Sequence, residues 1–187
     1  MIFKKDVFTI PNLLSLLRLA LVPLYATIYL NSITPADYLI AAGILAISCL
    51  TDLADGIIAR RFGMVSMLGK FLDPLADKIT QLTAILCLAT RYPLIRSIIP
   101  LFLTKELLQS FLAYIHFRKG KILSGALWAG KICTTVLFIS LFLLMVSPAL
   151  NFSFVKYLIL IDILFLIFAL VSYLAVYLGN SSKLCDP

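Results

Sequence analysis

The feature that most limits how this chain can fold is a succession of apolar segments, each long enough to cross a membrane. A bilayer core about 30 Å thick needs roughly 20 residues of helix. Hydrophobic residues make up 62% of the 187-residue chain and charged residues only 13%, about half the charged share of a soluble domain. The sequence therefore predicts an all-α integral membrane protein with six transmembrane helices. They are expected at about residues 12–30, 35–61, 73–90, 97–117, 123–146 and 154–178.

The rest of the chain contains no polar linker, low-complexity stretch or internal repeat, so residues 1–187 are expected to form a single domain. Residues 1–8 alternate apolar and charged side chains, which is typical of a short interfacial helix. The first apolar run continues as a span without a small-residue cleavage site, so no cleavable signal peptide is expected. Three of the four cysteines lie inside apolar segments and are expected to be buried thiols.

Positive charges predict the topology. The net charge is +7, but the basic residues flank apolar segments, so they indicate orientation and contact with acidic lipids rather than nucleic-acid binding. Nine lie on the side of the N-terminus and three on the other, which places both termini and the loop after the second span in the cytoplasm. The nine are Lys4, Lys5, Arg60, Arg61, Lys70, Arg118, Lys119, Lys121 and Lys183, and the three are Arg91, Arg96 and Lys156.

Four aspartates stand close together around that cytoplasmic loop. Asp52 and Asp55 are three residues apart near the end of the second span, and Asp73 and Asp77 are four apart at the start of the third. Residues three or four apart share one face of a helix, so each pair places like charges side by side. Intramembrane acids cost roughly 2.5–3.5 kcal/mol each. Antiparallel neighbouring helices would bring the four carboxylates to one cavity, where Mg²⁺ or Mn²⁺ would offset this cost.

Structural alternatives remain for individual residues. Asp73 before Pro74 is also the pattern of a helix N-cap followed by proline at the first helical position. Asp52 and Asp55 could instead form structural ion pairs. Between the two pairs, Gly56 and Ala59 would clear a helix face for a ligand, and Arg60 could meet a phosphate or act only as a topology signal. Gly69 is expected in the loop, as a turn glycine or as part of the site.

The whole stretch resembles the signature of the CDP-alcohol phosphotransferase family. All eight fixed positions match: Asp52, Asp55, Gly56, Ala59, Arg60, Gly69, Asp73 and Asp77. The resemblance implies transfer of a substituted phosphoryl group from a CDP-linked donor to an alcohol, with release of CMP. It also implies that the four aspartates hold two divalent cations, Mg²⁺ or Mn²⁺, and that Asp77 is in addition the general base.

A second, looser resemblance covers the first span. The stretch IPNLLSLLR, residues 10–18, is similar to the family's Pro-Asn, Ser/Thr and Arg pattern. It implies that Asn12, Ser15 and Arg18 contact the nucleotide diphosphate, together with Gly56, Ala59, Arg60, Ser66 and Gly69 in the CDP-lipid site. Asn12 and Ser15 could alternatively serve only as a cap or turn. An arginine inside a span, by contrast, needs an anionic partner.

The acceptor alcohol is the open question. The stretches FLDPLADK and IPNLLSLLRLALVPL resemble the phosphatidylglycerophosphate synthases and the related cardiolipin synthases of this family. The first group implies CDP-diacylglycerol and glycerol 3-phosphate as substrates. Lys105 and Lys131 would then bind the acceptor. Two expected basic residues are missing, because Ala113 and Cys133 stand near their places. Phosphatidylglycerol or another polar alcohol is therefore the alternative acceptor, and Lys105 and Glu106 could instead engage neighbouring helices.

Two other classes of protein are alternatives to a transferase. An ion-coupled transporter also carries intramembrane acids, but all four aspartates lie at one end of two helices, while Glu106 and Asp162 are isolated. A non-catalytic membrane scaffold has no need of like-charged pairs. The family resemblance further implies a homodimer. His116 and Trp128 are expected at the membrane interface rather than in catalysis.

Overall fold

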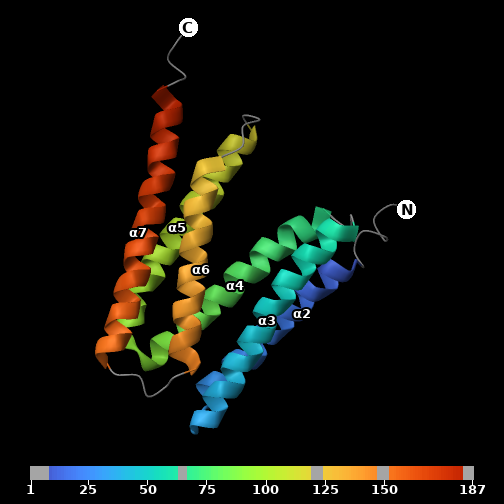
Figure 1. Cartoon of the computed structure of the whole chain (residues 1–187), viewed down its shortest axis with the longest axis vertical. Helices are drawn as coiled ribbons and strands as arrows, with labels where there is room; N and C mark the ends of the chain where they lie inside the picture. Colours follow the sequence, from blue (N-terminus) through green and yellow to red (C-terminus); the bar gives the residue numbers. More distant parts are fainter. Residues whose placement is uncertain (1–8, 63–66, 119–123, 147–151, 183–187) are drawn as a thin grey trace. The chain divides into compact units, whose positions relative to one another are not determined.

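The computed structural model of the chain describes residues 9–62, 67–118, 124–146 and 152–182 (Figure 1). Within these ranges the regular structure is entirely helical, with six α-helices and one short 3₁₀ helix. The prediction of an all-α fold is thus confirmed for this part of the chain, while the interfacial helix predicted at residues 1–8 lies outside it. The helices are α2 (Ile10–Leu30), α3 (Pro35–Phe62), α4 (Met67–Arg91), η1 (Pro93–Ser97), α5 (Ile98–Arg118), α6 (Ser124–Val146) and α7 (Phe152–Ser182).

Four of the described helices are long and apolar enough to cross a membrane. The qualifying segments are Pro11–Leu30, Pro35–Asp52, Trp128–Val146 and Ser153–Ala175. They support the prediction of an integral membrane protein. The further two spans, in α4 and α5, remain a prediction, because these two helices are not among the four.

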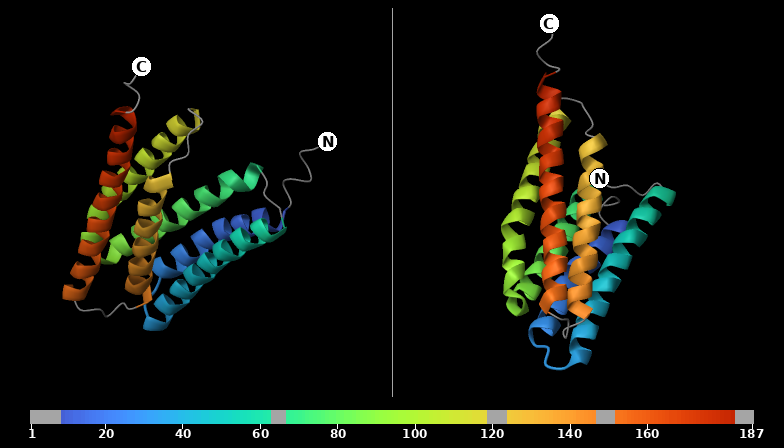
Figure 2. Two further views of the ribbon diagram at one scale, coloured as in Figure 1. Left: turned by 45° about the horizontal axis from the view of Figure 1, so that its top comes forward. Right: turned by 60° about the vertical axis from the view of Figure 1, so that its left-hand side comes forward.

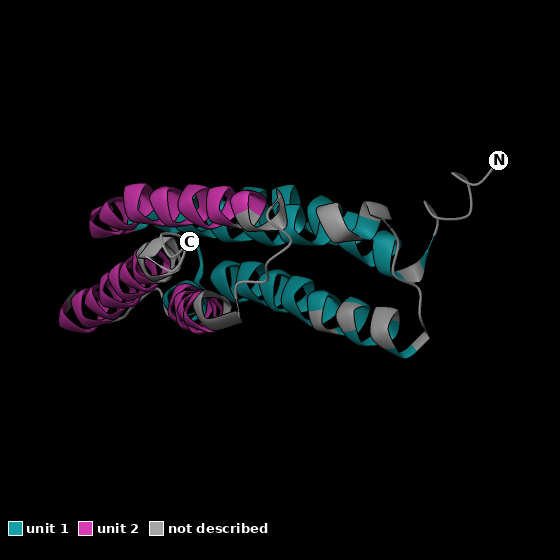
Figure 3. Cartoon of the chain, turned by 90° about the horizontal axis from the view of Figure 1, so that it is seen from above, with its two compact units in different colours: residues 1–91, 142–149 teal, residues 92–141, 150–187 magenta. Residues whose placement is uncertain are grey.

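The helices are grouped into two compact units, coloured separately in Figure 3. The first unit comprises residues 1–91 and 142–149, and the second comprises residues 92–141 and 150–187. In the first unit α2 packs against both α3 and α4, and Figures 1 and 2 show α2 and α3 side by side. In the second unit α5 packs against α7, and η1 contacts both.

Helix α2 buries a polar stripe and exposes an apolar one. Its buried residues recur every three or four positions, so they form one face of the helix. The exposed face carries Leu13, Leu16, Leu17 and Leu24, which suits a helix surrounded by lipid rather than water. The buried face consists of Asn12, Ser15, Arg18, Val22, Tyr25 and Tyr29. Its N-terminal half is therefore polar, and its C-terminal half is apolar and aromatic.

Helix α4 begins earlier than the sequence predicts. It starts at Met67 rather than at Asp73, and Pro74 lies inside it. The interpretation of Asp73-Pro74 as a helix start is therefore wrong, and Gly69 is a buried helical residue rather than a loop residue. A proline inside a helix interrupts one backbone hydrogen bond, but packing of α4 against α2 outweighs this local signal, as tertiary contacts commonly do.

The second unit contains two close contacts between α6 and α7. Ser140 Oγ donates a hydrogen bond to Asp162 Oδ2, and both residues are buried. Nearer the N-terminus of α6, Gly130 faces the hydroxyl of Tyr173 so closely that a Cβ at position 130 would overlap with it. Asp162, isolated in the sequence, thus has a polar partner on the neighbouring helix. Cys87 and Cys133 are buried free thiols as expected, and Cys49 is a half-buried one.

Candidate active site

The polar half of the buried face of α2 forms the base of the site. Asn12, Ser15 and Arg18 follow one another at intervals of three residues, so they lie on one side of the helix. All three are buried, and the side chain of Arg18 is only 2% exposed. Tyr25, farther along the same face, donates a hydrogen bond to the carbonyl oxygen of Thr80 at 2.8 Å and so fixes α2 against α4. The polar residues of α2 are thereby held between the two helices that carry the aspartates.

Arg18 binds both aspartates of α3. Its Nη1 lies 2.5 Å from Asp52 Oδ1, and its Nη2 donates to Asp55 Oδ2 at 2.6 Å. The two carboxylates share one turn of α3, which allows one planar guanidinium to reach both. Asp55 is buried, whereas the side chain of Asp52 is 41% exposed. Asp52 therefore lies at the accessible side of this cluster.

Ser15 links the aspartates of the two helices. Its Oγ lies 2.5 Å from Asp73 Oδ1 on α4 and 3.4 Å from Asp55 Oδ2 on α3. A third oxygen, the carbonyl of Pro11, is 3.0 Å away. A hydroxyl carries a single proton, so the short contact with Asp73 is the strongest bond available to it. Asp52, Asp55 and Asp73 are thus brought together by two residues of α2.

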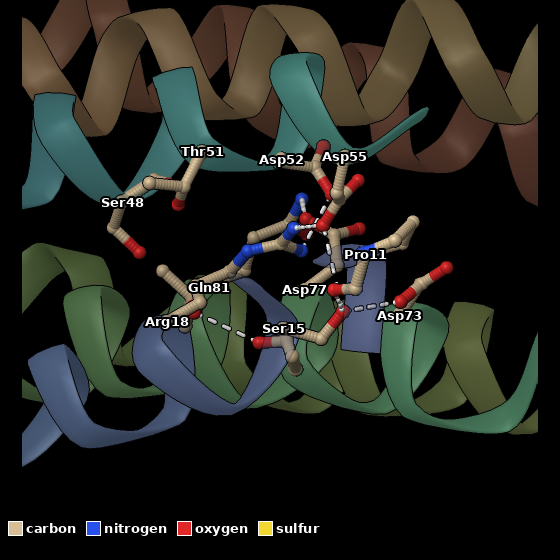
Figure 4. Close-up of polar contacts among 12 residues, drawn as sticks. Pro11, Ser15, Arg18, Ser48, Thr51, Asp52, Asp55, Asp73, Asp77 and Gln81 are labelled. Atoms are coloured by element: carbon tan, nitrogen blue, oxygen red, sulfur yellow. Dashed lines mark hydrogen bonds and ion pairs between the residues drawn. The ribbon is translucent and has the colours of Figure 1, made fainter. Parts of the chain in front are cut away.

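Asp77 lies one turn beyond Asp73 on the same face of α4. Gln81 Nε2, one further turn along, donates to Asp77 Oδ1 at 3.3 Å. Figure 4 shows the four aspartates, Ser15 and Arg18 between α2, α3 and α4. Gln81 was not among the residues predicted from the sequence, although its spacing of four residues from Asp77 places it on the aspartate face. The four predicted metal ligands are therefore gathered within the first unit.

The chemistry of these donors fits a hard divalent cation. Four carboxylates carry four negative charges, and Arg18 offsets one of them. Oxygen donors of this kind are those that Mg²⁺ and Mn²⁺ prefer. Among the described residues, no three His, Cys, Asp or Glu side chains are arranged to hold a metal ion. Instead, Arg18 and Ser15 lie directly against the carboxylate oxygens.

Other predicted residues are placed less completely. Gly56, Ala59 and Arg60 lie in the last turns of α3, but their side chains are outside the described part of the structure, as is the whole of Ser66. Gly69 is buried in the first turn of α4. These residues lie along the chain between the two aspartate pairs, at the ends of α3 and α4 that carry them. Their contacts with a ligand stay a prediction.

The two predicted acceptor lysines differ in their surroundings. Both belong to the second unit. Lys105 is 1% exposed, and its Nζ lies 2.6 Å from Oε1 of Glu106, the next residue of α5. Lys131 is exposed, and its Nζ lies 5.8 Å from the centre of the Trp128 ring.

Comparison with known proteins places the chain in a family. The model of the CDP-alcohol phosphatidyltransferase family matches residues 8–177. The chain belongs to the CDP-alcohol phosphatidyltransferase family. This confirms the predicted class of enzyme and argues against a transporter or a non-catalytic scaffold.

Individual relatives within and around this family carry informative names. A probable phosphatidylglycerophosphate synthase of Mycobacterium tuberculosis is 38% identical over 144 residues, covering 75% of this chain and 68% of the relative. A CDP-diacylglycerol–glycerol-3-phosphate 3-phosphatidyltransferase of Escherichia coli K12 is 32% identical over 144 residues, covering 75% of this chain and 79% of the relative. A Schizosaccharomyces pombe fusion of a CMP-forming cardiolipin synthase and a mitochondrial hydrolase is 37% identical over 116 residues, 62% of this chain and 19% of the fusion.

Proposed function

We propose that this CDP-alcohol phosphatidyltransferase transfers the phosphatidyl group of CDP-diacylglycerol to glycerol 3-phosphate, forming phosphatidylglycerophosphate and CMP. The observation that carries the chemistry is the convergence of Asp52, Asp55 and Asp73 on Ser15 and Arg18 of α2. The bacterial relatives named for glycerol 3-phosphate, which align over 75% of the chain, support this acceptor. The family match over residues 8–177 also supports one catalytic domain.

Two divalent cations, Mg²⁺ or Mn²⁺, would be held by Asp52, Asp55, Asp73 and Asp77. When bound, they would neutralise charge on the transferring phosphoryl group and orient the diphosphate. Arg18, Asn12 and Ser15 contribute the buried polar donors beside these carboxylates, and Arg60 would add charge for the nucleotide diphosphate. Gly56, Ala59, Gly69 and Ser66 complete the CDP-lipid site in this proposal.

The reaction needs one proton acceptor. An oxygen of the alcohol attacks the phosphorus that carries diacylglycerol, the bond from this phosphorus to the bridging oxygen breaks, and CMP leaves with the electron pair. The proton of the attacking hydroxyl passes to the carboxylate of Asp77. Gln81, which donates to Asp77 Oδ1, would hold that carboxylate in place.

Lys105 and Lys131 are proposed to bind the phosphate of the acceptor. Lys105 is the more suitable of the two, because it is buried beside Glu106 and has a fixed position. A cardiolipin synthase activity, with phosphatidylglycerol as acceptor, is the second candidate. It is favoured by the similarity to the fission yeast fusion protein and by the absence of the two basic residues noted near Ala113 and Cys133.

The protein is proposed to be a multi-pass protein of the bacterial plasma membrane, with six spans. Both termini and the aspartate site would face the cytoplasm, where glycerol 3-phosphate is available, and two copies would form a homodimer. The four apolar helices and the bacterial relatives support the membrane location. The positive charge distribution of the sequence supports the orientation.

A purified sample given CDP-diacylglycerol and Mg²⁺ tests the reaction and the acceptor together. CMP release is followed with glycerol 3-phosphate, phosphatidylglycerol, inositol, serine or no alcohol. We expect the fastest release with glycerol 3-phosphate. Faster release with phosphatidylglycerol would establish the cardiolipin alternative, and a folded protein that releases no CMP with any alcohol would overturn the proposal.

Replacing Asp77 by Asn tests the proposed general base. Such bases contribute about 10²–10⁴-fold to rates, so turnover of Asp77→Asn should fall by at least about a hundredfold while binding of CDP-diacylglycerol largely persists. Asp37→Asn is the matched control. Asp37 Oδ2 accepts backbone hydrogen bonds from Thr34 and Ile33 at the other end of α3, so this variant should keep its activity. Near-normal turnover of Asp77→Asn would exclude the assignment.

A further inference from the structure

Arg18 holds two of the carboxylates that the proposed function assigns to divalent cations. Its two terminal nitrogens lie 2.5 and 2.6 Å from Asp52 Oδ1 and Asp55 Oδ2. The family resemblance, however, directs this same side chain to the nucleotide diphosphate. Each terminal nitrogen thus directs a donor at a carboxylate oxygen that a divalent cation would need. Arg18 therefore has to leave these oxygens when a cation takes them.

We propose that Arg18 is an exchangeable counter-ion that couples metal binding to CDP-lipid binding. Arg18 and a divalent cation compete for the same oxygens of Asp52 and Asp55. When the cation takes these oxygens, the guanidinium is released and becomes available to the diphosphate. This inference rests on the proposed function and adds to it a thermodynamic link between the two ligands.

The burial of Arg18 predicts that the cation and the diphosphate strengthen, rather than weaken, each other's binding. The side chain is 2% exposed, and a buried charge that loses its partner is strongly destabilising. Metal binding alone would leave Arg18 beside further positive charge without a counter-ion. An anionic diphosphate restores the balance, so each ligand should strengthen binding of the other by the same factor.

A second feature of Arg18 points to an anionic ligand. Its Nε is buried and has no hydrogen-bond partner among the described residues. Buried donors are nearly always satisfied in folded proteins. An anion that approaches the guanidinium from the side of Nε would satisfy this donor. Ser15, one turn earlier on α2, has a short polar side chain and would keep this side of the helix polar. Lysine, with a single ammonium group, could not bridge both carboxylates and still present such a donor.

The test measures binding rather than turnover. Mn²⁺ binding to the full-length protein in detergent is followed by electron paramagnetic resonance, with and without cytidine 5′-diphosphate as the diphosphate probe. In the unsubstituted protein, the probe should tighten Mn²⁺ binding by a factor within the usual range for coupled sites, about 5 to 150. In Arg18→Gln, Mn²⁺ alone should bind several-fold more tightly than in the unsubstituted protein, and the probe should change its affinity by a much smaller factor, which leaves only the direct contact between the cation and the diphosphate.

Two further variants keep the test decisive. Arg91→Gln removes an arginine that lies over the ring of Tyr38 at the other end of the first unit, and it should leave Mn²⁺ affinity and coupling unchanged. If Arg18→Gln does not fold, Arg18→Lys replaces it, because an ammonium group holds only one carboxylate and should also compete less with Mn²⁺. Unchanged or weaker Mn²⁺ binding in a folded Arg18 variant, or full coupling without the guanidinium, would overturn the inference.

The outcome is independent of the acceptor assay. No alcohol is present in the Mn²⁺ titrations, so a protein that released no CMP with any alcohol could still show competition between Arg18 and Mn²⁺. Conversely, an active enzyme whose Arg18 variants bind Mn²⁺ no more tightly would disprove the exchange and leave the proposed function intact.

Discussion

At the scale of single residues, Ser15 has an unusual position because it touches carboxylates from two helices. Its Oγ is 2.5 Å from Asp73 and 3.4 Å from Asp55. The sequence alone left open whether this serine was a cap or a ligand contact. Its burial on the face of α2 that meets both aspartate pairs favours a direct role in positioning them.

Replacing Ser15 by Ala should impair catalysis without unfolding the protein. A hydrogen bond to a charged group is worth about 1.5–3 kcal/mol, so we expect kcat/KM to fall by about ten- to one-hundred-fold. Ser15→Thr keeps the hydroxyl and should retain most of the activity. Steady-state CMP release by the two variants measures the difference. Equal loss in both would show that shape, and not the hydroxyl, matters at this position.

At the scale of elements, packing depends on buried polar side chains in α2 and on a small residue in the α6–α7 pair. In the first unit, α2 links α3 and α4 through its buried polar stripe. In the second, Gly130 of α6 makes room for the hydroxyl of Tyr173 of α7. Small residues at helix contacts allow close approach inside membranes.

The contact between Gly130 and Tyr173 predicts a specific loss of stability. A Cβ at position 130 would overlap with the tyrosine hydroxyl, and overpacking of this kind costs about 1–3 kcal/mol. Gly130→Ala should therefore lower the thermal midpoint in detergent, and adding Tyr173→Phe should restore it. Gly43→Ala is the matched control, because nothing lies near the added Cβ, and alanine favours a helix. A destabilised Gly43→Ala, with stable Gly130→Ala, would contradict the packing described.

At the scale of the whole molecule, the arrangement of α4 and α5 in the membrane distinguishes six spans from four. Both helices are long enough to cross, at about 1.5 Å of rise per residue, but neither is among the four described helices that are long and apolar enough to be candidate spans. With four spans, η1 would stay on the cytoplasmic side. With six, it would lie outside.

Labelling of an introduced cysteine in η1 decides between these arrangements. In a variant with all native cysteines replaced by serine, Ser97→Cys should react with a membrane-impermeant maleimide in intact cells, because Ser97 is exposed and is placed outside by six spans. Asn31→Cys, in the exposed turn after α2, is the control that is outside in both arrangements. Labelling of position 97 only after permeabilisation would show that α4 and α5 do not cross.

Much of the architecture and the reaction class followed from the sequence. Apolar runs of about 20 residues leave few alternatives to helices in a membrane, because only helices satisfy the backbone within each span. The spacing of Asp52, Asp55, Asp73 and Asp77 predicted two like-charged faces that need positive charge. The resemblance of this stretch to a family signature implied the reaction class, which the family match confirmed. The spans and the aspartate faces depend on local rules of periodicity and charge, which a sequence displays directly.

The tertiary structure decided which residue supplies positive charge to the aspartates. Local signals placed the start of α4 at Asp73, whereas packing against α2 extends the helix back to Met67. The sequence assigned Arg18 to a phosphate, but the structure places its guanidinium on Asp52 and Asp55. Such contacts join residues more than thirty positions apart, and their geometry depends on how three helices pack. Spacing along the chain determines which residues share a face, and only the packing of the helices determines what each face meets.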